Sequence, residues 1–304
     1  MQKFQSQISK STFLVTGGAG FIGSNLVEYL INNNAKKVIV FDNLSNGYRE
    51  NIEEFQNYDN FEFVEGDIRD LKHLKTVVNR SDYISHQAAL GSVPRSIENP
   101  ILTNDVNING FLNILVAINE GPNVKGFVYA ASSSTYGDSK DLPKVEGNEG
   151  KPISPYAVTK AVNEMYADVF FRTYGLSSVG LRYFNVFGPK QNPDNPYAAV
   201  IPLFCDAFMN SKAPTINGDG ETSRDFTYVS NAVQANIRGL FSNLDGHQVF
   251  NVACGERTSL NDMIQILNKI SSKEIVANYG PERKGDVKHS LAEISNISKN
   301  LGYA

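Results

Sequence analysis

Two residues one helical turn apart in this sequence are suited to acid–base chemistry. Tyr156 and Lys160 bracket the segment "YAVTK", and residues spaced i and i+4 share one face of a helix. A lysine ammonium beside a phenol stabilises the phenolate and lowers a pKa that is normally about 10. Tyr156 could then exchange a proton near neutral pH. The pattern also arises by chance, so an ordinary exposed helix is the alternative interpretation of the pair alone.

A run of hydroxyl groups precedes this tyrosine along the chain. The segment "YAASSSTYG", residues 129–137, begins as a buried strand and then continues with Ser132, Ser133 and Ser134. A phenol and a hydroxyl relay suffice to move one proton, whereas removing a second proton or expelling a hydroxyl needs a further acid or base. The absence of a carboxylate at this point therefore argues against dehydration. Capping of the strand end is the alternative role for these serines.

A glycine-rich turn near the N-terminus indicates a dinucleotide site. The motif "TGGAGFIG" (16–23) places Gly17, Gly20 and Gly23 between a short apolar strand and a helical pattern. Such glycines let the backbone approach a pyrophosphate, which the helix N-terminus attracts. Asp42 ends the next strand, where an acid binds the adenosine ribose hydroxyls and repels a 2′-phosphate. The pattern predicts NAD rather than NADP, with a simple turn cap as the alternative role of Asp42.

Alternating strands and helices would position these residues. Strands are predicted at 12–16, 37–42, 61–67, 82–89, 126–133 and 177–188, and helices at 21–33, 70–79, 104–120 and 154–174. This alternation predicts an α/β fold with a Rossmann-type doubly wound parallel sheet. The chain after residue 188 is rich in Pro, Gly, Asn and Asp. We therefore expect a NAD-binding domain at 1–188, which includes the YxxxK helix, and a smaller α/β substrate lobe at 189–304.

Composition excludes several classes of protein. The 304 residues are 41% hydrophobic and 20% charged, and the formal charge is 28 − 32 = −4. A mildly acidic chain gives no sign of a nucleic-acid or membrane-surface partner. Cys205 and Cys254 lack the spacing of metal ligands, so no metal site and no disulfide are predicted. No unbroken apolar run and no signal peptide stand out, so we expect a cytoplasmic protein.

Taken together and in order, the motifs resemble an extended short-chain dehydrogenase/reductase of the UDP-hexose 4-epimerase family. The matching segments cover roughly residues 11–303 and are "TGGAGFIG", "DNLSNG", "GDIRD", "HQAA", "SSSTYG", "SPYAVTK", "LRYFNVFG", "GDGETSRDF" and "GDVKHS". The segments "QAALGSVPRSI" and "AASSSTYGD" are most similar to the UDP-N-acetylglucosamine 4-epimerase branch. The resemblance implies NAD-dependent, reversible C4 epimerisation of UDP-GlcNAc and UDP-GalNAc through a 4-keto sugar.

The resemblance also assigns roles to individual residues. It implies that Ser132 is the catalytic hydroxyl, Tyr156 the acid–base, and Lys160 the residue that holds the tyrosine and the nicotinamide ribose. The implied cofactor-binding residues are Gly17, Gly20, Phe21, Ile22, Gly23, Asp42, Asn43, Ser45, Asn46, Gly47, Asp67, Ile68, Gln87, Ala88, Ala89, Asn107, Tyr156, Lys160 and Phe184.

A second implied set would bind the UDP sugar. It consists of Gly91, Ser132, Ser133, Ser134, Asn185, Ala199, Val200, Thr215, Asn217, Arg224, Arg283, Asp286 and Ser290. Both arginines would hold the diphosphate, and Asp286 the uridine ribose. Gly91 and Ser290 are small where the family carries a lysine and a tyrosine. Their size favours a sugar that carries an N-acetyl group.

Other readings stay open at this point. One is a 4-epimerase for UDP-Glc/UDP-Gal or for uronates, with Arg95 as a contact for an acidic sugar, although an internal ion pair is favoured for that arginine. Another is an NAD-binding regulatory protein, which the intact Ser132–Tyr156–Lys160 set argues against. The resemblance further implies a homodimer through a four-helix bundle and a role in polysaccharide biosynthesis. Family chains continue past "LGY", so a C-terminal truncation after Ala304 is expected.

Overall fold

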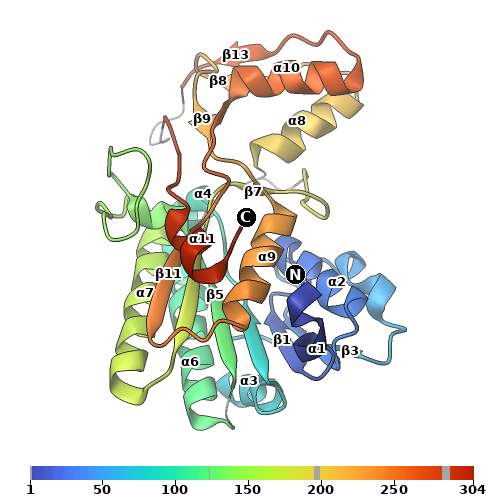
Figure 1. The fold of residues 1–304 in the computed structure, drawn as a ribbon. Coiled ribbons are helices and arrows are strands. Elements are labelled where there is room, and N and C mark those ends of the chain that lie inside the picture. Colours follow the sequence, from blue (N-terminus) through green and yellow to red (C-terminus); the bar gives the residue numbers. More distant parts are fainter. Residues whose placement is uncertain (1, 123, 195–198, 283–287) are drawn as a thin grey trace.

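A seven-stranded parallel sheet forms the centre of the molecule. The computed structural model describes residues 2–122, 124–194, 199–282 and 288–304 (Figure 1). The strand order is β11-β6-β5-β4-β1-β2-β3, and every neighbouring pair is parallel. The strands are β1 (Thr12–Thr16), β2 (Lys37–Asp42), β3 (Phe61–Glu65), β4 (Tyr83–His86), β5 (Gly126–Ser132), β6 (Ser178–Tyr183) and β11 (His247–Val252). The order reverses between β1 and β4, where doubly wound folds bind their ligands.

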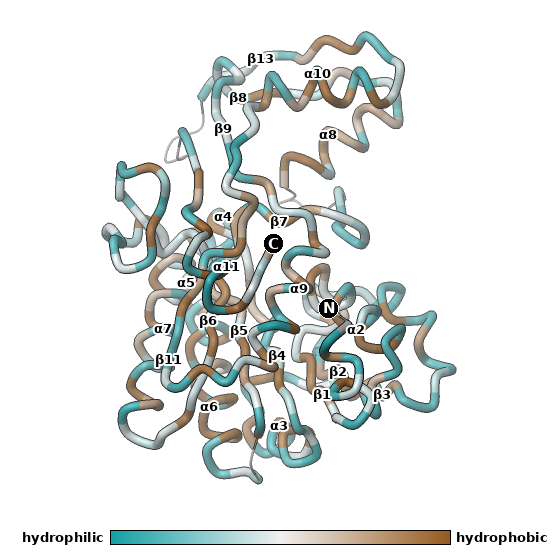
Figure 2. Tube along the Cα trace, viewed as in Figure 1, coloured by the Kyte–Doolittle hydropathy of each residue, from teal (hydrophilic) through white to brown (hydrophobic). Residues whose placement is uncertain are grey.

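Helices cover both faces of this sheet. One core joins α2 (Phe21–Asn32), α9 (Val229–Leu240) and α11 (Ser295–Leu301) to strand residues such as Val15. The other joins α3 (Leu71–Val78), α6 (Gly110–Glu120) and α7 (Pro155–Tyr174) to residues such as Leu14. Neighbouring strand residues face opposite sides, so continuous apolar runs are needed to fill both cores. Figure 2 shows these brown, hydrophobic stretches along the buried elements and teal in many connecting loops.

A smaller lobe lies beyond the carboxyl ends of the strands, at the top of Figure 1. It contains α8 (Val200–Met209), α10 (Leu260–Ser271), and the parallel pair β8 (Thr215–Asn217) and β13 (Asn278–Gly280). Its own core includes Phe204, Phe208, Ile216 and Met263. Two further strands, β9 (Ser223–Arg224) and β12 (Thr258–Ser259), pair antiparallel within this region.

The expected boundary between two domains at residue 188 does not match the structure, because segments after residue 188 belong to the large sheet and its core. Strand β11 pairs with β6 from His247↔Ser178 to Val252↔Tyr183, and α9 belongs to a core of the large sheet. The chain therefore enters the smaller lobe, returns to the sheet, enters the lobe again and ends against the sheet in α11. The loop-rich sequence after residue 188 did not indicate that the chain returns to the sheet, because only one short strand, β11, and one helix, α9, make this return.

The helix expected at 104–120 is interrupted by a change of helical geometry. After α4 (Val93–Glu98), α5 (Pro100–Asn104) runs into a π-helical turn, η4 (Asp105–Asn109), before α6 begins. Such turns are frequent at functional sites, and Asn107 lies in this one. Pro100–Glu120 as a whole is long and apolar enough to match a membrane span, with mean hydropathy 1.3, but 44% of that window is buried within the fold.

Candidate active site

A cavity of about 560 Å³ runs along the carboxyl ends of β1, β2, β4, β5 and β6. It lies where the strand order reverses, as expected for a doubly wound fold. Twenty-two of the residues proposed from the sequence line it, namely Gly17, Gly20, Phe21, Ile22, Gly23, Asp42, Asn43, Ser45, Asn46, Gly47, Asp67, Ile68, Gln87, Ala88, Ala89, Gly91, Ser132, Ser133, Tyr156, Lys160, Asn185 and Ala199.

The glycine turn forms a close-fitting cradle at one end of the cavity. Gly17 has φ +68°, and a Cβ there would come within 2.6 Å of the backbone nitrogen of Ala88. A Cβ at Gly23 would clash with the carbonyl oxygen of Gly17. Helix α2 starts at this turn and has no side-chain cap, so its first N–H groups are available to a phosphate. The cradle therefore fits a dinucleotide pyrophosphate.

Asp42 occupies the end of β2 beside this cradle. Its buried carboxylate accepts hydrogen bonds from the backbone amides of Ala19 (3.0 Å) and Leu44 (2.9 Å). Burial raises the pKa of Asp42, and both amide hydrogen bonds oppose that rise. Each carboxylate oxygen can accept more than one hydrogen bond, so capacity is left for a ribose hydroxyl.

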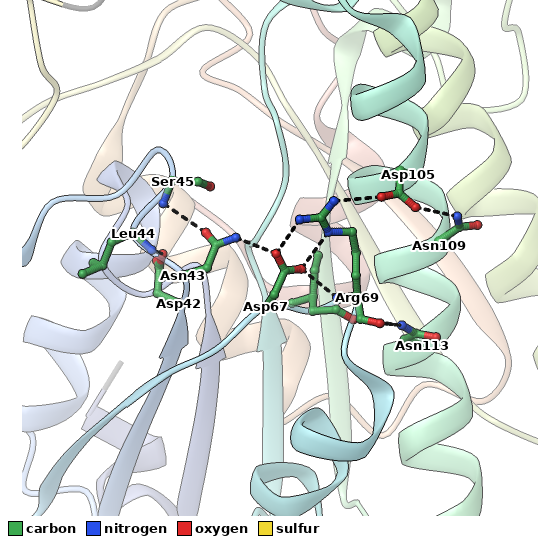
Figure 3. Close-up of polar contacts among 10 residues, drawn as sticks. Asp42, Asn43, Leu44, Ser45, Asp67, Arg69, Asp105, Asn109 and Asn113 are labelled. Atoms are coloured by element: carbon green, nitrogen blue, oxygen red, sulfur yellow. Dashed lines mark hydrogen bonds and ion pairs between the residues drawn. The ribbon is translucent and has the colours of Figure 1, made fainter.

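A second acid, Asp67, also lines this end of the cavity. Figure 3 shows Asn43 donating to Asp67 at 2.9 Å, and Arg69 bridging Asp67 and Asp105. The guanidinium of Arg69 lowers the pKa of Asp67 to about 2, so this carboxyl group is ionised at neutral pH. Because Arg69 balances the charge of Asp67, the preference for NAD over NADP rests on Asp42.

Ser132, Tyr156 and Lys160 meet at the other end of the cavity. Ser132 ends β5, and its Oγ accepts from the amide (3.2 Å) and hydroxyl (2.9 Å) of Ser134. Tyr156 is in the first turn of α7, whose N-cap Ser154 accepts from the amide of Ala157 at 3.1 Å. The start of α7 is thus fixed in place, which sets the direction of the tyrosine side chain.

The electrostatics of this trio differ from the simple expectation. Burial raises the pKa of Tyr156, and a hydrogen bond with Ser132 opposes the rise. Lys160 Nζ donates to the carbonyl of Ala130 at 2.7 Å and lies 6.0 Å from the centroid of the Tyr156 ring. Burial also lowers the pKa of Lys160 to about 8. The structure therefore does not show the predicted fall in the pKa of Tyr156, because burial raises this pKa and the Ser132 hydrogen bond offsets only part of the rise.

Two residues proposed as cofactor contacts are not among the lining residues of this cavity. Asn107 is buried behind the wall, where it bonds to both the amide (2.8 Å) and the carbonyl (3.2 Å) of Leu90. It also donates to Thr159 Oγ1 at 3.1 Å. Phe184 is fully buried in a separate cluster with Tyr136, Ala253 and Ala292. Neither side chain lines the described cavity, and the assignment of both residues to cofactor binding stays a prediction.

The proposed substrate residues divide into three groups. Gly91, Ser132, Ser133, Asn185 and Ala199 line the described cavity. Arg283 and Asp286 lie outside the described residues. A third group is not part of the described lining and consists of Ser134, Val200, Thr215, Asn217, Arg224 and Ser290.

The structure gives the surroundings of three members of this third group. Ser134 bonds to Ser132, and Val200 opens α8 immediately after the lining residue Ala199. The Arg224 guanidinium donates to the carbonyls of Ser223 (3.0 Å) and Lys288 (3.2 Å), within the smaller lobe. The described cavity is thus mainly the cofactor site with the adjoining reaction centre.

Sequence reasoning missed several lining residues, of which Tyr183 and Lys190 are the most informative. Side chains alternate along a strand, and Tyr183, the last residue of β6, lines the cavity while the next residue, Phe184, is buried in another cluster. This alternation could have identified Tyr183. Lys190 is held by Glu28 (2.9 Å) and Glu54 (3.2 Å), contacts between distant segments that no local motif predicts.

The fold and the cavity together define a dinucleotide-binding enzyme of the short-chain dehydrogenase/reductase type. Residues 13–253 match the model of the NAD dependent epimerase/dehydratase family. The chain belongs to this family, and its cofactor is NAD. The cradle at Gly17 and Gly23 and the acids Asp42 and Asp67 fit that cofactor.

Several solved and curated proteins are similar over nearly the whole chain. UDP-N-acetylglucosamine 4-epimerase from Methanobrevibacter ruminantium, solved with UDP-N-acetylmuramic acid, is 41% identical with a TM-score of 0.92, covering 97% of this chain and 93% of that one. The putative UDP-glucose 4-epimerase of Methanocaldococcus jannaschii is 37% identical, covering 95% and 92%. UDP-glucuronic acid 4-epimerase from Bacillus cereus, solved with UDP-glucuronic acid and NAD, is 31% identical with a TM-score of 0.88, covering 96% and 93%.

Proposed function

We propose that this protein is an NAD-dependent UDP-sugar 4-epimerase whose preferred substrates are UDP-GlcNAc and UDP-GalNAc. The observation that carries the proposal is the trio Ser132, Tyr156 and Lys160 on the wall of the NAD cavity, with no acid next to Ser132 among the described lining residues. The similar proteins named above support the 4-epimerase reaction, and their names differ in the sugar.

The chain's own groups supply proton transfer at the sugar O4. Bound NAD, held by the glycine turn and Asp42, would supply the hydride acceptor and donor for the sugar C4. Tyr156 takes the O4 proton and later gives it back, and Ser132, which hydrogen-bonds Tyr156, relays it. Lys160 in its ammonium form stabilises the phenolate of Tyr156. To do so, Lys160 gives up its hydrogen bond to the Ala130 carbonyl and bonds to the phenolate oxygen instead.

The described lining residues at the reaction centre do not include the acid and base groups that a dehydration would need. Among the described lining residues the acids are Asp42, which ends β2, and Asp67, which follows β3, both at the adenosine end. Ser133 lies on the wall next to Ser132, and Ser134 hydrogen-bonds to Ser132. A dehydratase would need an acid and a base at this position to remove a C5 proton and expel a hydroxyl. The 4-keto sugar would therefore be reduced again rather than dehydrated.

The wall at Gly91 supports the larger sugar. Gly91 is exposed at the cavity wall, and a Cβ added there would meet no atom of the described residues within 4 Å, so a larger group can be accommodated beside it. An N-acetyl group needs such space when the 4-keto sugar turns over between the two hydride transfers. Arg95, the candidate contact for a uronate, donates to the side-chain oxygen of Asn46 at 3.0 Å, on the cofactor side of the cavity.

Proton NMR of the anomeric signals tests the substrate preference. Purified protein without added NAD would be mixed with UDP-GlcNAc and, separately, with UDP-Glc and UDP-glucuronic acid. The proposal predicts that UDP-GalNAc appears several times faster than UDP-Gal. Faster conversion of UDP-Glc or of UDP-glucuronic acid would contradict the N-acetyl preference and leave the 4-epimerase reaction intact.

We also propose that the protein is a homodimer through helices α5, α6 and α7. Ile101 (82% exposed), Met165 (65%) and Val158 (46%) are large apolar side chains at the surface of α5 and α7. Such a concentration of apolar surface favours an interface. Analytical ultracentrifugation should find a dimer for the wild type and a monomer for Met165→Asp. A wild-type monomer at micromolar concentration would contradict the proposal.

A further inference from the structure

Four polar side chains form a closed hydrogen-bonded ring at the wall of the cofactor cavity. Gln87 follows β4 and Tyr183 ends β6, and both line the cavity. Ser85 lies in β4 and is buried. The fourth member, Asn236, belongs to α9 and has no exposed surface.

The bonds of this ring connect every member to at least two others. The Tyr183 hydroxyl donates to Gln87 Oε1 at 3.1 Å and accepts from Asn236 Nδ2 at 2.7 Å. Gln87 Nε2 donates to Ser85 Oγ at 2.9 Å and to Asn236 Oδ1 at 3.0 Å. Ser85 Oγ in turn donates to Asn236 Oδ1 at 2.9 Å.

Asn236 is the member whose bonding capacity is completely used. Its Oδ1 accepts two hydrogen bonds, and the second hydrogen of Nδ2 goes to the carbonyl of Ala232 at 2.8 Å, one turn earlier in α9. An amide has two donor hydrogens and two acceptor lone pairs, so all four are satisfied. The carbonyl of Ala232 can only accept, which fixes the orientation of the amide.

The position of Gln87 affects the cofactor site directly. Its backbone nitrogen donates to the carbonyl of Thr16 at 3.0 Å, so it is joined to the end of β1. The next residue, Ala88, lies so close to Gly17 that a Cβ added at Gly17 would not fit. A shift of Gln87 would therefore move the contact between the glycine turn and the segment after β4.

We propose that Asn236 is a positioning residue for NAD. Asn236 acts through Gln87 and Tyr183 and does not contact the cofactor. A pre-ordered wall binds more tightly because less freedom is lost on binding. In a low-dielectric interior, a complete polar network holds its members rigidly, and an incomplete one leaves buried groups without partners. The proposal concerns cofactor retention, so it does not depend on which sugar is turned over.

The substitution Asn236→Asp tests this with little change in size. A carboxylate oxygen would replace Nδ2 and would face two acceptors, the Tyr183 oxygen and the Ala232 carbonyl. We expect NAD to leave the purified holoprotein about 10-fold faster than it leaves the wild type. The release is measured after dilution, with an excess of a dehydrogenase that captures the free NAD. The NAD content of the protein as purified should fall as well.

Asn231→Asp is the matched control, because it makes the same change on the same helix. Asn231 donates to Cys254 Sγ at 3.6 Å and does not line the cavity. Its NAD release rate should equal that of the wild type. If Asn236→Asp does not fold, Asn236→Leu removes the same hydrogen bonds without introducing charge, and the same faster release is expected.

A double-mutant cycle with Tyr183→Phe separates positioning from general stability. If Asn236 acts through Tyr183, the fold-increase in NAD release rate of the double variant should be clearly smaller than the product of the fold-increases of the two single variants. Urea unfolding of each variant gives the change in stability. Release of NAD from both Asn236 variants within twofold of the wild type, together with a loss of stability, would show a purely structural role and overturn the proposal.

Discussion

The two ends of the cavity are built in different ways. At the adenosine end, buried or paired polar groups hold one another, with Asp42 bonded to two backbone amides and Asp67 paired with Arg69. At the sugar end, the wall at Gly91 can accommodate a larger group. A pre-ordered end suits a cofactor that stays bound, and a roomy end suits a sugar that must rotate. From this difference we expect cofactor retention and sugar turnover to depend on separate parts of one site.

The largest effect is expected at the reaction centre. Tyr156→Phe removes the hydroxyl that exchanges the O4 proton, so kcat should fall by about 10³-fold. The NAD content should stay at the wild-type level, because the glycine cradle is untouched. Coupled kinetic assays and NAD quantification check both statements. Residual activity above a tenth of the wild type would exclude Tyr156 as the acid–base.

The next effect is expected at the adenosine end. Asp42→Ala removes a ribose acceptor and leaves the buried amides of Ala19 and Leu44 without their partner. Each lost bond of this kind costs about 1–3 kcal/mol, so NAD affinity should fall at least 10-fold and unfolding free energy should also drop. Calorimetric titration with NAD and urea unfolding measure the two. Unchanged NAD affinity would contradict the assignment of Asp42.

A substitution at the sugar end should act selectively. Gly91→Leu fills the space beside this glycine, so turnover of UDP-GlcNAc should fall about 10-fold relative to turnover of UDP-Glc, with NAD content unchanged. Gly91→Ala serves as the control, because its single methyl group meets no atom within 4 Å and should leave both rates near the wild type. Equal losses for both sugars would refute the role of this wall in substrate choice.

The smallest effect is a shift of the pH profile. Glu164, one turn after Lys160, raises the pKa of that lysine and so opposes the lowering caused by burial. Lys160 is needed as an ammonium, so activity should decline as pH rises through about 8. Glu164→Gln removes the favourable charge, and the alkaline limb of kcat/KM should move to lower pH.

The control for this shift is Asp168→Asn, one turn further along α7. Asp168 is partly exposed and pairs with Arg172, also on α7, so the pH profile of that variant should match the wild type. Glu164 uses both carboxylate oxygens to hold the buried Arg182, at 2.9 and 2.7 Å, so the Gln variant needs a check of folding by circular dichroism. A well-folded Glu164→Gln with an unmoved alkaline limb would contradict the electrostatic role.

Local patterns were sufficient to predict six of the seven strands of the sheet and the glycine turn that opens α2. The same patterns singled out Asp42 and the YxxxK pair, whose roles stay predictions. Each of these depends on residues close together in the sequence, where backbone geometry fixes the relative positions. Asn236 is different, because its partner Gln87 is 149 positions away along the chain. The return of β11 to the sheet also depends on long-range pairing. Such contacts are set by packing, which single-sequence patterns do not encode.

The most direct test of the proposed reaction follows the hydrogen at C4. The protein would be given UDP-GlcNAc carrying deuterium at C4, in ordinary water and without added NAD, and the product would be examined by NMR and mass spectrometry. Hydride that passes to NAD and returns to the same sugar predicts UDP-GalNAc that keeps its deuterium at C4. Product that has exchanged this deuterium for solvent hydrogen, or a protein with full NAD content that converts no UDP sugar, would contradict the account.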